Sequence, residues 1–430
     1  MTALADTDAN PIALDLIMGA AEKHDIVASE DIFDDRGVKL WSSGQTISRS
    51  LQQRLLERKL QRPLESCLRA QDGVSIIDLL DDTDAFFSND QDALARALKP
   101  QALAIAHEIP QMQLHPVAQL LLTAVRTSGS AAYTHAVRGM VLAGALAVAA
   151  GRPEDTYFLR LALTGGLLHD IGEMYVDPQY LRATHTLGIE QYRHVVAHPQ
   201  IGQRLLASQT DYPPELARAI GEHHERLDGS GYPAQRRADA VSPLGQLLAV
   251  METTLGICHS AETPLARASF AMRVIPGEFS LRWVGPVVSA AQAAAEDLGA
   301  GAADSAAVED LDRRLEDCRA RAATIGSRSS DETVRRICAK AHHLLGRLRA
   351  GWNAVGMWSA GGEDLGPAEG FEQRMAAREL AWRMRYVQRE CLWPVRDLSA
   401  AGAEALQPLW DALAPAETSK GAPQVAAAAG

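Results

Sequence analysis

The chain has 430 residues, which is more than one ordinary hydrophobic core accommodates and predicts two or three domains. Its 47% hydrophobic content with only 5% aromatics, much of it alanine and leucine, is typical of a globular, mainly helical protein. The formal charge of −12 argues against general binding of DNA or of anionic membranes, because both require an excess of Lys and Arg.

Cysteine usage and the N-terminus indicate a reducing compartment. The five cysteines are scattered singly without a C-x-x-C pair, so we expect neither a disulfide framework nor a thiolate zinc site. The first ten residues are polar and acidic, and the longest apolar stretch, 141–150, is about half of what spans a bilayer. We therefore expect a soluble, unprocessed, cytoplasmic protein.

Residues 1–100 predict a small α+β domain. Two short β-type runs between 26 and 47 flank the acidic, glycine-ended sequence at 34–37, which suits the turn of a hairpin. The sequence Ser50–Gln53 has the spacing of a capping box and predicts the start of a helix. The apolar stripe of this helix consists of Leu51, Leu55, Leu56 and Leu60.

The rest of the chain predicts helices. From 101 to 290 the apolar periodicity is helical throughout, with Gly and Pro at the turns. A stretch rich in Ala, Gly and Asp at 296–307 predicts a linker, and a C-terminal helical region follows at 308–413. The tail at 414–430 has little to bury and is expected to be disordered. The predicted fold class is mainly α, with a small N-terminal α+β unit.

Histidines are concentrated in one part of the predicted body, where seven of the 13 lie between His135 and His224. His169-Asp170 ends a long apolar helix, and His223-His224-Glu225 shortly precedes the glycine-rich string at 228–233. Neutral imidazoles and carboxylates together suit Mn, Fe, Ni, Co or Zn, and a carboxylate can bridge two ions with one oxygen on each. Two ions about 3.5 to 4 Å apart can hold a hydroxide and neutralise charge on a phosphodiester under attack, without a Ser or Cys nucleophile. Asp170 is the bridging candidate.

The order of these motifs resembles that of the HD-GYP family. The strings are H-D-I-G at 169–172, H-P-Q-I-G at 198–202 and H-H-E-R-L-D-G-S-G-Y-P at 223–233, and the likeness covers residues 125 to 290. The resemblance implies an all-helical domain that holds two or three metal ions, commonly iron or manganese. It also implies hydrolysis of bacterial cyclic di-GMP to linear pGpG or GMP.

The resemblance also assigns roles to individual residues. Asp170 and His169 form the candidate catalytic pair, and the loop of Gly231, Tyr232 and Pro233 lies near the substrate or a partner domain. Arg236, just beyond this loop, is a candidate phosphate contact, although an exposed charge is the better explanation. The ligands carried over by motif position are His135, His169, Asp170, His198, His223 and His224, with Glu252 where the family has an Asp.

Three positions depart from the family pattern. Ala131, four residues before His135, stands where some members have a Glu that holds a third ion, so we expect two ions. Glu173 replaces a Lys that is expected to meet substrate phosphate, and Glu252 is one methylene longer than the family's Asp. Glu173 would either repel the phosphate or turn toward the metals, and it is kept among the candidate catalytic residues.

Several of these residues also have explanations without chemistry. His135 taken alone fits a helix surface or a core, Glu252 fits a surface carboxylate, and the string at 228–233 fits a surface turn. His185 and His194 are expected to be bystanders.

Three functional hypotheses follow. The leading one is a metal-dependent cyclic di-GMP phosphodiesterase with two divalent ions, Fe or Mn first and Ni, Co or Zn as alternatives. The main alternative is a degenerate HD-GYP module that binds nucleotide or a protein partner without turnover, which Glu173 and Glu252 favour. An HD-type hydrolase of nucleoside phosphates is a third, against which the GYP loop argues. Expected partners are a cyclic dinucleotide and, at the GYP loop, proteins such as the GGDEF type; the flanking domains suggest regulation or homodimer contacts.

Overall fold

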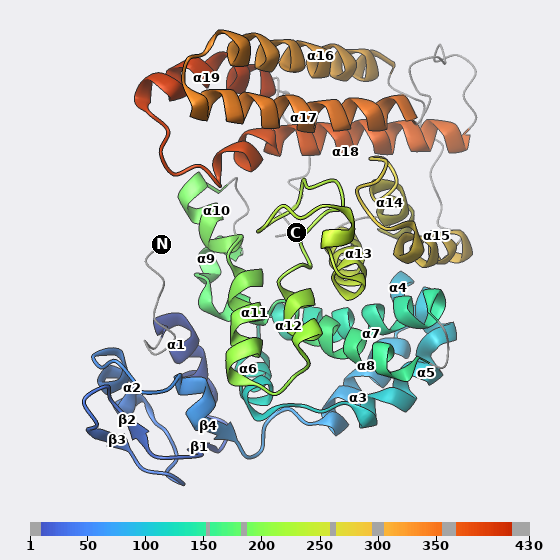
Figure 1. Cartoon of the computed structure of the whole chain (residues 1–430). Coiled ribbons are helices and arrows are strands. Elements are labelled where there is room, and N and C mark those ends of the chain that lie inside the picture. The colour runs from blue at the N-terminus through green and yellow to red at the C-terminus, as the bar shows by residue number, and fades with distance from the viewer. Residues whose placement is uncertain are drawn as a thin grey trace.

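The computed structural model describes residues 10–151, 155–181, 187–258, 264–294, 305–354 and 367–414. Within these ranges the protein is mainly α-helical with two small antiparallel sheets, as the sequence predicts. Figure 1 shows an N-terminal unit with strands, a central helical body and a C-terminal layer of helices. The predicted tail lies outside the described residues after Ala414, and so does the predicted linker up to residue 304.

The N-terminal unit contains the predicted hairpin. Its elements are α1 (Pro11–Ala20), β1 (Ile26–Ala28), β2 (Ile32–Phe33), β3 (Lys39–Trp41), α2 (Arg49–Leu56), a 3-10 turn η1 (Leu64–Cys67) and β4 (Leu68–Ala70). Strands β2 and β3 pair antiparallel around a turn in which Gly37 has a φ of 80°. The Asp34 carboxylate accepts the N–H groups of Arg36 and Val38 in this turn, at 3.0 and 2.8 Å. Strand β1 pairs instead with the distant β4.

Two details of α2 differ from the prediction. The helix begins at Arg49 with Ser48 at the N-cap, so the capping box predicted at Ser50 is wrong. Leu51 and Leu55 are buried, but Leu56 is 45% exposed because only the face of this two-turn helix toward α1 is covered. The predicted stripe is therefore wrong at Leu56, and Leu60, although buried, lies beyond the end of the helix.

The central body is a set of packed helices that share one hydrophobic core with the N-terminal unit. Helices α3 (Ile76–Phe87) and α5 (Ala102–Glu108) pack on α7 (Ala131–Ala150), and one core runs from Leu14 to Val287. The predicted domain boundary at residue 100 stays a prediction. The helices are α3 (Ile76–Phe87), α4 (Ala93–Leu98), α5 (Ala102–Glu108), α6 (Pro116–Thr127), α7 (Ala131–Ala150), α8 (Thr156–Leu168), α9 (Pro178–Leu181), α10 (Ile189–Val195), α11 (His198–Gln209), α12 (Pro214–Ile220), α13 (Pro243–Cys258), α14 (Pro264–Ala271) and α15 (Leu281–Ala294), with a 3-10 turn η4 (Ile171–Tyr175) after α8.

Helices α7 and α8 cross in close contact, and this crossing positions the end of α8. A Cβ built on Gly166 would lie 2.3 Å from the carbonyl oxygen of Gly139, so only glycine permits this approach. The crossing brings His169, the C-cap of α8, against the α7 helix that carries His135. Helix α7 is long and apolar enough to cross a membrane by length and composition, but 67% of its most apolar window is buried inside the molecule.

The C-terminal layer has its own core. It consists of α16 (Ser305–Arg328), α17 (Glu332–Ala354), α18 (Pro367–Leu392) and α19 (Ala400–Leu413). Phe270, Val274 and Ile275 from the body join this core, and α18 faces α14 (Figure 1). The layer is therefore packed onto the body at the segment between α14 and α15.

Candidate metal centre

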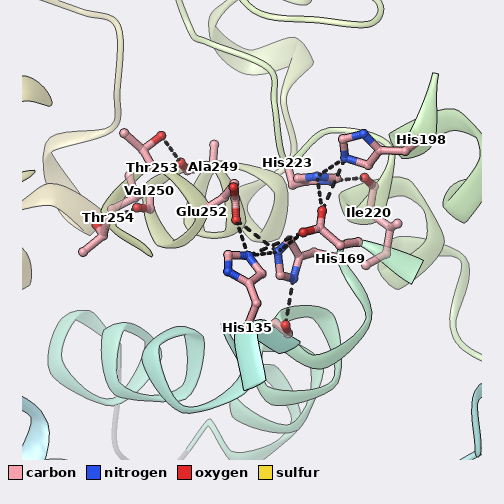
Figure 2. Close-up of polar contacts among 12 residues, drawn as sticks. His135, His169, His198, Ile220, His223, Ala249, Val250, Glu252, Thr253 and Thr254 are labelled. Carbon is pink, nitrogen blue, oxygen red and sulfur yellow. Dashed lines mark hydrogen bonds and ion pairs between the residues drawn. The ribbon is translucent and has the colours of Figure 1, made fainter. Parts of the chain in front are cut away.

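The seven predicted metal ligands come together at one place in the central body. Figure 2 shows His135, His169, His198, His223 and Glu252 among them. His135 projects from the start of α7, His169 is the C-cap of α8, and Asp170 follows it. His198 is the first residue of α11, whereas Glu252 lies inside α13. The remaining two ligands, His223 and His224, follow the end of α12.

The ligand atoms form two groups that share Asp170. One group is Asp170, His198, His223 and His224, the other is His135, His169, Asp170 and Glu252, and the candidate ligand atoms within each lie within 4.8 Å of one another. Oδ1 of Asp170 is 3.3 Å from Nε2 of His198 and 3.4 Å from Nε2 of His223. Oδ2 is 3.1 Å from Nε2 of His169 and 3.4 Å from Nε2 of His135. One oxygen of Asp170 thus faces each group, which is the geometry of a carboxylate that bridges two ions.

Glu252 is buried within the group that it forms with His135, His169 and Asp170. Its side chain is 2% exposed, and its Oε2 lies 3.0 Å from Nε2 of both His135 and His169. The extra methylene relative to Asp is therefore accommodated by the position of α13. The surface-carboxylate explanation of Glu252 is wrong, because the residue is buried.

Backbone carbonyls fix the tautomers of three of the histidines. Nδ1 lies 2.8 Å from the Gly166 carbonyl in His169, 2.7 Å from the Val195 carbonyl in His198, and 2.6 Å from the Ile220 carbonyl in His223. A carbonyl only accepts, so each Nδ1 carries the hydrogen and each neutral ring presents its lone pair at Nε2. This second contact is the usual orienting partner of a metal-bound histidine.

The fit of a cation follows from these tautomers. Nε2 of His198 and Nε2 of His223 lie 3.0 Å apart, so two lone pairs face each other across the first group. Such lone pairs repel unless a positive species lies between them. The buried Nδ1 of His224 and the Oδ1 of Asp170 have no hydrogen-bond partner within the protein, and Oδ1 faces the same space. The donor set of imidazole nitrogens and carboxylate oxygens suits a divalent transition metal.

Electrostatics keep the carboxylates of the centre ionised. Burial by itself would raise the pKa of Asp170, but the electrostatic influence of His169, followed by that of His198 and His223, holds that pKa well below its usual range. Burial, with the nearby His223, lowers the pKa of His224 well below that of a free imidazole, so this ring is neutral at neutral pH. Both states are those that a metal ligand requires.

The GYP loop packs against His224. The Tyr232 ring stacks on the His224 ring with centroids 4.5 Å apart and an interplanar angle of 18°, and Tyr232 is 5% exposed. A Cβ on Gly231 would lie 2.4 Å from both the backbone nitrogen of Arg226 and the carbonyl oxygen of His224, so this position requires glycine. Gly231 and Tyr232 therefore pack against the candidate ligand His224. Contact of Gly231, Tyr232 and Pro233 with substrate stays a prediction.

The structure also places the remaining candidates. Glu173 lies half-buried in η4 and belongs to neither ligand group; burial and the charges of Asp170 and Glu252 raise its pKa well above the ordinary value. Arg236 is turned toward Glu222, at 3.6 Å, and its contact with phosphate stays a prediction. His194 is exposed and in neither group, whereas His185 lies outside the described residues.

Two buried carboxylates beside the ligands were not singled out from the sequence. Glu225 accepts the backbone N–H groups of Ala234 and Arg236 at 2.7 and 2.9 Å, and so anchors the chain that leaves the GYP loop. Glu222 accepts the N–H of Ser242 at 2.8 Å and anchors the approach to α13. Only their positions next to His223 and His224 could have indicated them.

Comparisons with known proteins agree with this geometry. The HD domain family model matches residues 127–260, the part of the chain that holds all seven candidate ligands. A cyclic di-GMP phosphodiesterase of Pseudomonas aeruginosa is 35% identical over 138 residues, which are 32% of this chain and 33% of that protein. Residues 127–260 therefore match an HD domain, and their ordered motifs resemble those of the HD-GYP family.

Other relatives are similar over a comparable share of the chain. A 3′3′-cGAMP-specific phosphodiesterase of Vibrio cholerae is 31% identical over 153 residues, covering 29% of this chain and 32% of that protein. A cyclic di-GMP phosphodiesterase response regulator of Xanthomonas campestris is 26% identical over 160 residues, covering 37% of this chain and 41% of that protein. The chain thus spans less than half the length of these relatives.

Proposed function

We propose that this protein is a metal-dependent phosphodiesterase that hydrolyses a cyclic dinucleotide, with cyclic di-GMP as the first candidate and linear pGpG or GMP as the product. The observation that carries the proposal is the pair of four-residue ligand groups that share Asp170, one oxygen to each group. A single structural metal would need only one such group. Two adjacent sites are the arrangement used for in-line displacement at phosphorus.

The chain's own residues would divide the work as follows. Two divalent ions, with Fe or Mn as first candidates, would supply Lewis acidity and a nucleophile at neutral pH. His198, His223 and His224 would hold one ion and His135, His169 and Glu252 the other, with Asp170 common to both. The hydrogen bonds from Nδ1 to backbone carbonyls keep the rings from rotating, so the ligand geometry is set before substrate arrives.

The relatives support the substrate class. Two of the similar proteins are named for cyclic di-GMP and one for 3′3′-cGAMP, so a cyclic dinucleotide is their common feature. A second candidate function is a nucleotide-binding module without turnover, and the observation that favours it is Glu173. This carboxylate feels the charges of Asp170 and Glu252, and it stands where a cation would favour an anionic substrate.

A turnover assay tests the proposal. Protein loaded anaerobically with Mn(II) or Fe(II) should open cyclic di-GMP or 3′3′-cGAMP to the linear dinucleotide, as followed by chromatography. Asp170→Asn should abolish turnover with both metals, because it removes the charge shared by the two ligand groups. The matched control is Asp81→Asn, which removes an exposed carboxylate on α3 and should turn over like wild type. Binding of both nucleotides in calorimetry without product would replace the enzyme by the binding module.

A further inference from the structure

A buried ion network joins the C-terminal layer to the body. Arg383 of α18 donates through Nη1 to both carboxylate oxygens of Glu278, at 2.7 and 2.6 Å, and through Nε to Glu379 at 2.8 Å. Glu278 lies between α14 and α15, and its carboxylate is also 3.9 Å from Nε of Arg226. The side chains of Arg383, Glu278 and Arg226 are 16%, 5% and 14% exposed. Charges buried to this degree are costly without partners, so each member depends on the others.

The network continues to the ligands of the candidate metal centre. Arg226 is two residues after His224, and its Nη2 donates to Oγ1 of Thr253, the residue after Glu252, at 3.0 Å. The backbone N–H of Leu227 donates to the carbonyl oxygen of Glu278 at 2.9 Å. Arg383 is thus linked through Glu278 to the chain segment that leaves His224.

The C-terminal layer also contacts other chain segments near the ligands Asp170, His198, His223 and His224. Arg347 of α17 lies 3.4 Å from Asp228, inside the string that forms the GYP loop. Arg193 of α10, five residues before His198, donates through Nε to the carbonyl of Trp393 at 2.8 Å. Both attachments reach segments whose ligands belong to the group of Asp170, His198, His223 and His224. Within the described residues, the layer itself contacts segments of this group, whereas the group of His135, His169 and Glu252 is reached through the hydrogen bond of Arg226 to Thr253.

We propose that the C-terminal layer positions the His223–His224 segment and that Arg383, acting through Glu278 and Arg226, is the positioning residue that sets the affinity of the ion in the His198–His223–His224 group. The inference rests on the proposed two-metal function. It assigns a role to a region of the chain that lies beyond the matched HD domain. If the contacts between the C-terminal layer and the body are lost, the ion of the His198–His223–His224 group should leave before the other ion. A partner that binds the layer would therefore control the occupancy of the metal centre.

Metal titration of the full chain tests this inference. In Arg383→Met the ion of the His198–His223–His224 group should bind about 10- to 100-fold more weakly, the range seen when an outer partner of a ligand is removed, while the other ion keeps its affinity. With Mn(II), the electron paramagnetic resonance spectrum should change from that of a coupled pair to that of an isolated ion. Arg383→Lys keeps a charge opposite Glu278 and should recover part of the loss.

The matched control is Arg349→Met. Arg349 is a half-buried arginine of the same layer, but it pairs with Asp312 and Glu316 of α16 and should leave both ions in place. If Arg383→Met does not fold, Arg347→Met tests the attachment at Asp228, with the same selective loss expected. Wild-type affinity for both ions in the folded variants, or an equal loss of both, overturns the inference. Wild type that binds two ions without turnover contradicts the proposed function alone, whereas wild type that binds no ion contradicts both.

Discussion

The close packing of α7 against α8 can be tested by a substitution, without an assay of turnover. Gly166→Ala places a Cβ 2.3 Å from the carbonyl oxygen and 2.6 Å from the carbonyl carbon of Gly139. These are backbone atoms, so the helices must separate by about 1 Å to restore an ordinary contact near 3.5 Å. Overpacking of this kind costs about 1 to 3 kcal/mol, partly offset by the better helix propensity of alanine, which contributes up to about 1 kcal/mol.

The same movement should reach the metal centre. Nε2 of His135, on α7, lies 3.1 Å from Nε2 of His169 at the end of α8, so separation of the two helices moves these two ligands apart. We expect Gly166→Ala to lower the free energy of unfolding in urea and to weaken the ion of the His135 group. Gly19→Ala is the control, because nothing lies within 4 Å of its Cβ in α1, and it should stabilise the protein slightly. A Gly166→Ala protein as stable as Gly19→Ala would refute the close crossing.

Substitutions at three further positions have defined outcomes. Asp78→Ala removes the capping box with Ser75, so stability at neutral pH should fall by about 1 kcal/mol in urea. The hydrogen bond from Ser75 is the largest cause that lowers the pKa of Asp78 to about 2. The Asp78 carboxylate therefore stabilises the folded protein fully above the pKa that Asp78 has in the unfolded chain. The difference in free energy of unfolding between Asp78→Ala and wild type should vanish as the pH falls from about 4 to about 2. Tyr232→Phe should keep the stack on His224 and the metal content of wild type, whereas Tyr232→Ala should lose the ion of the His224 group in metal analysis; equal metal in both would exclude a supporting role for the ring. Glu173→Lys places a cation at this position and should lower the KM for cyclic di-GMP about 5-fold or more at unchanged metal content, and an unchanged KM would make Glu173 a bystander.

The gathering of the candidate ligands was largely predictable from the sequence because most of them lie in short strings at helix ends. His169 ends α8 and His198 begins α11, so the local sequence already fixes where each ring points. Glu252 could not be settled in this way, because no string surrounds it and its burial depends on how α13 packs among the other helices. The contact of the Arg236 side chain with Glu222 was also not predictable, because it depends on the path of the chain after the GYP loop.

Long-range pairings account for most of what the sequence did not predict. Strand β1 pairs with β4 across the intervening hairpin and helix α2, and no local pattern marks either strand as the other's partner. The Arg383–Glu278 pair joins residues 105 positions apart in two regions that looked independent. Charged residues on amphipathic helices usually face solvent, so their burial here becomes visible only once the layer is packed onto the body.

Metal analysis of wild type and ligand variants tests the central claim, that two ions share Asp170, most directly. Wild type should hold about two transition-metal ions per chain, as expected for a two-metal phosphodiesterase. Asp170→Ala should lose most of both ions, His198→Ala mainly one, and Asp81→Asn neither. A metal content near zero in wild type, or one ion that remains fully bound in Asp170→Ala, would contradict the shared carboxylate.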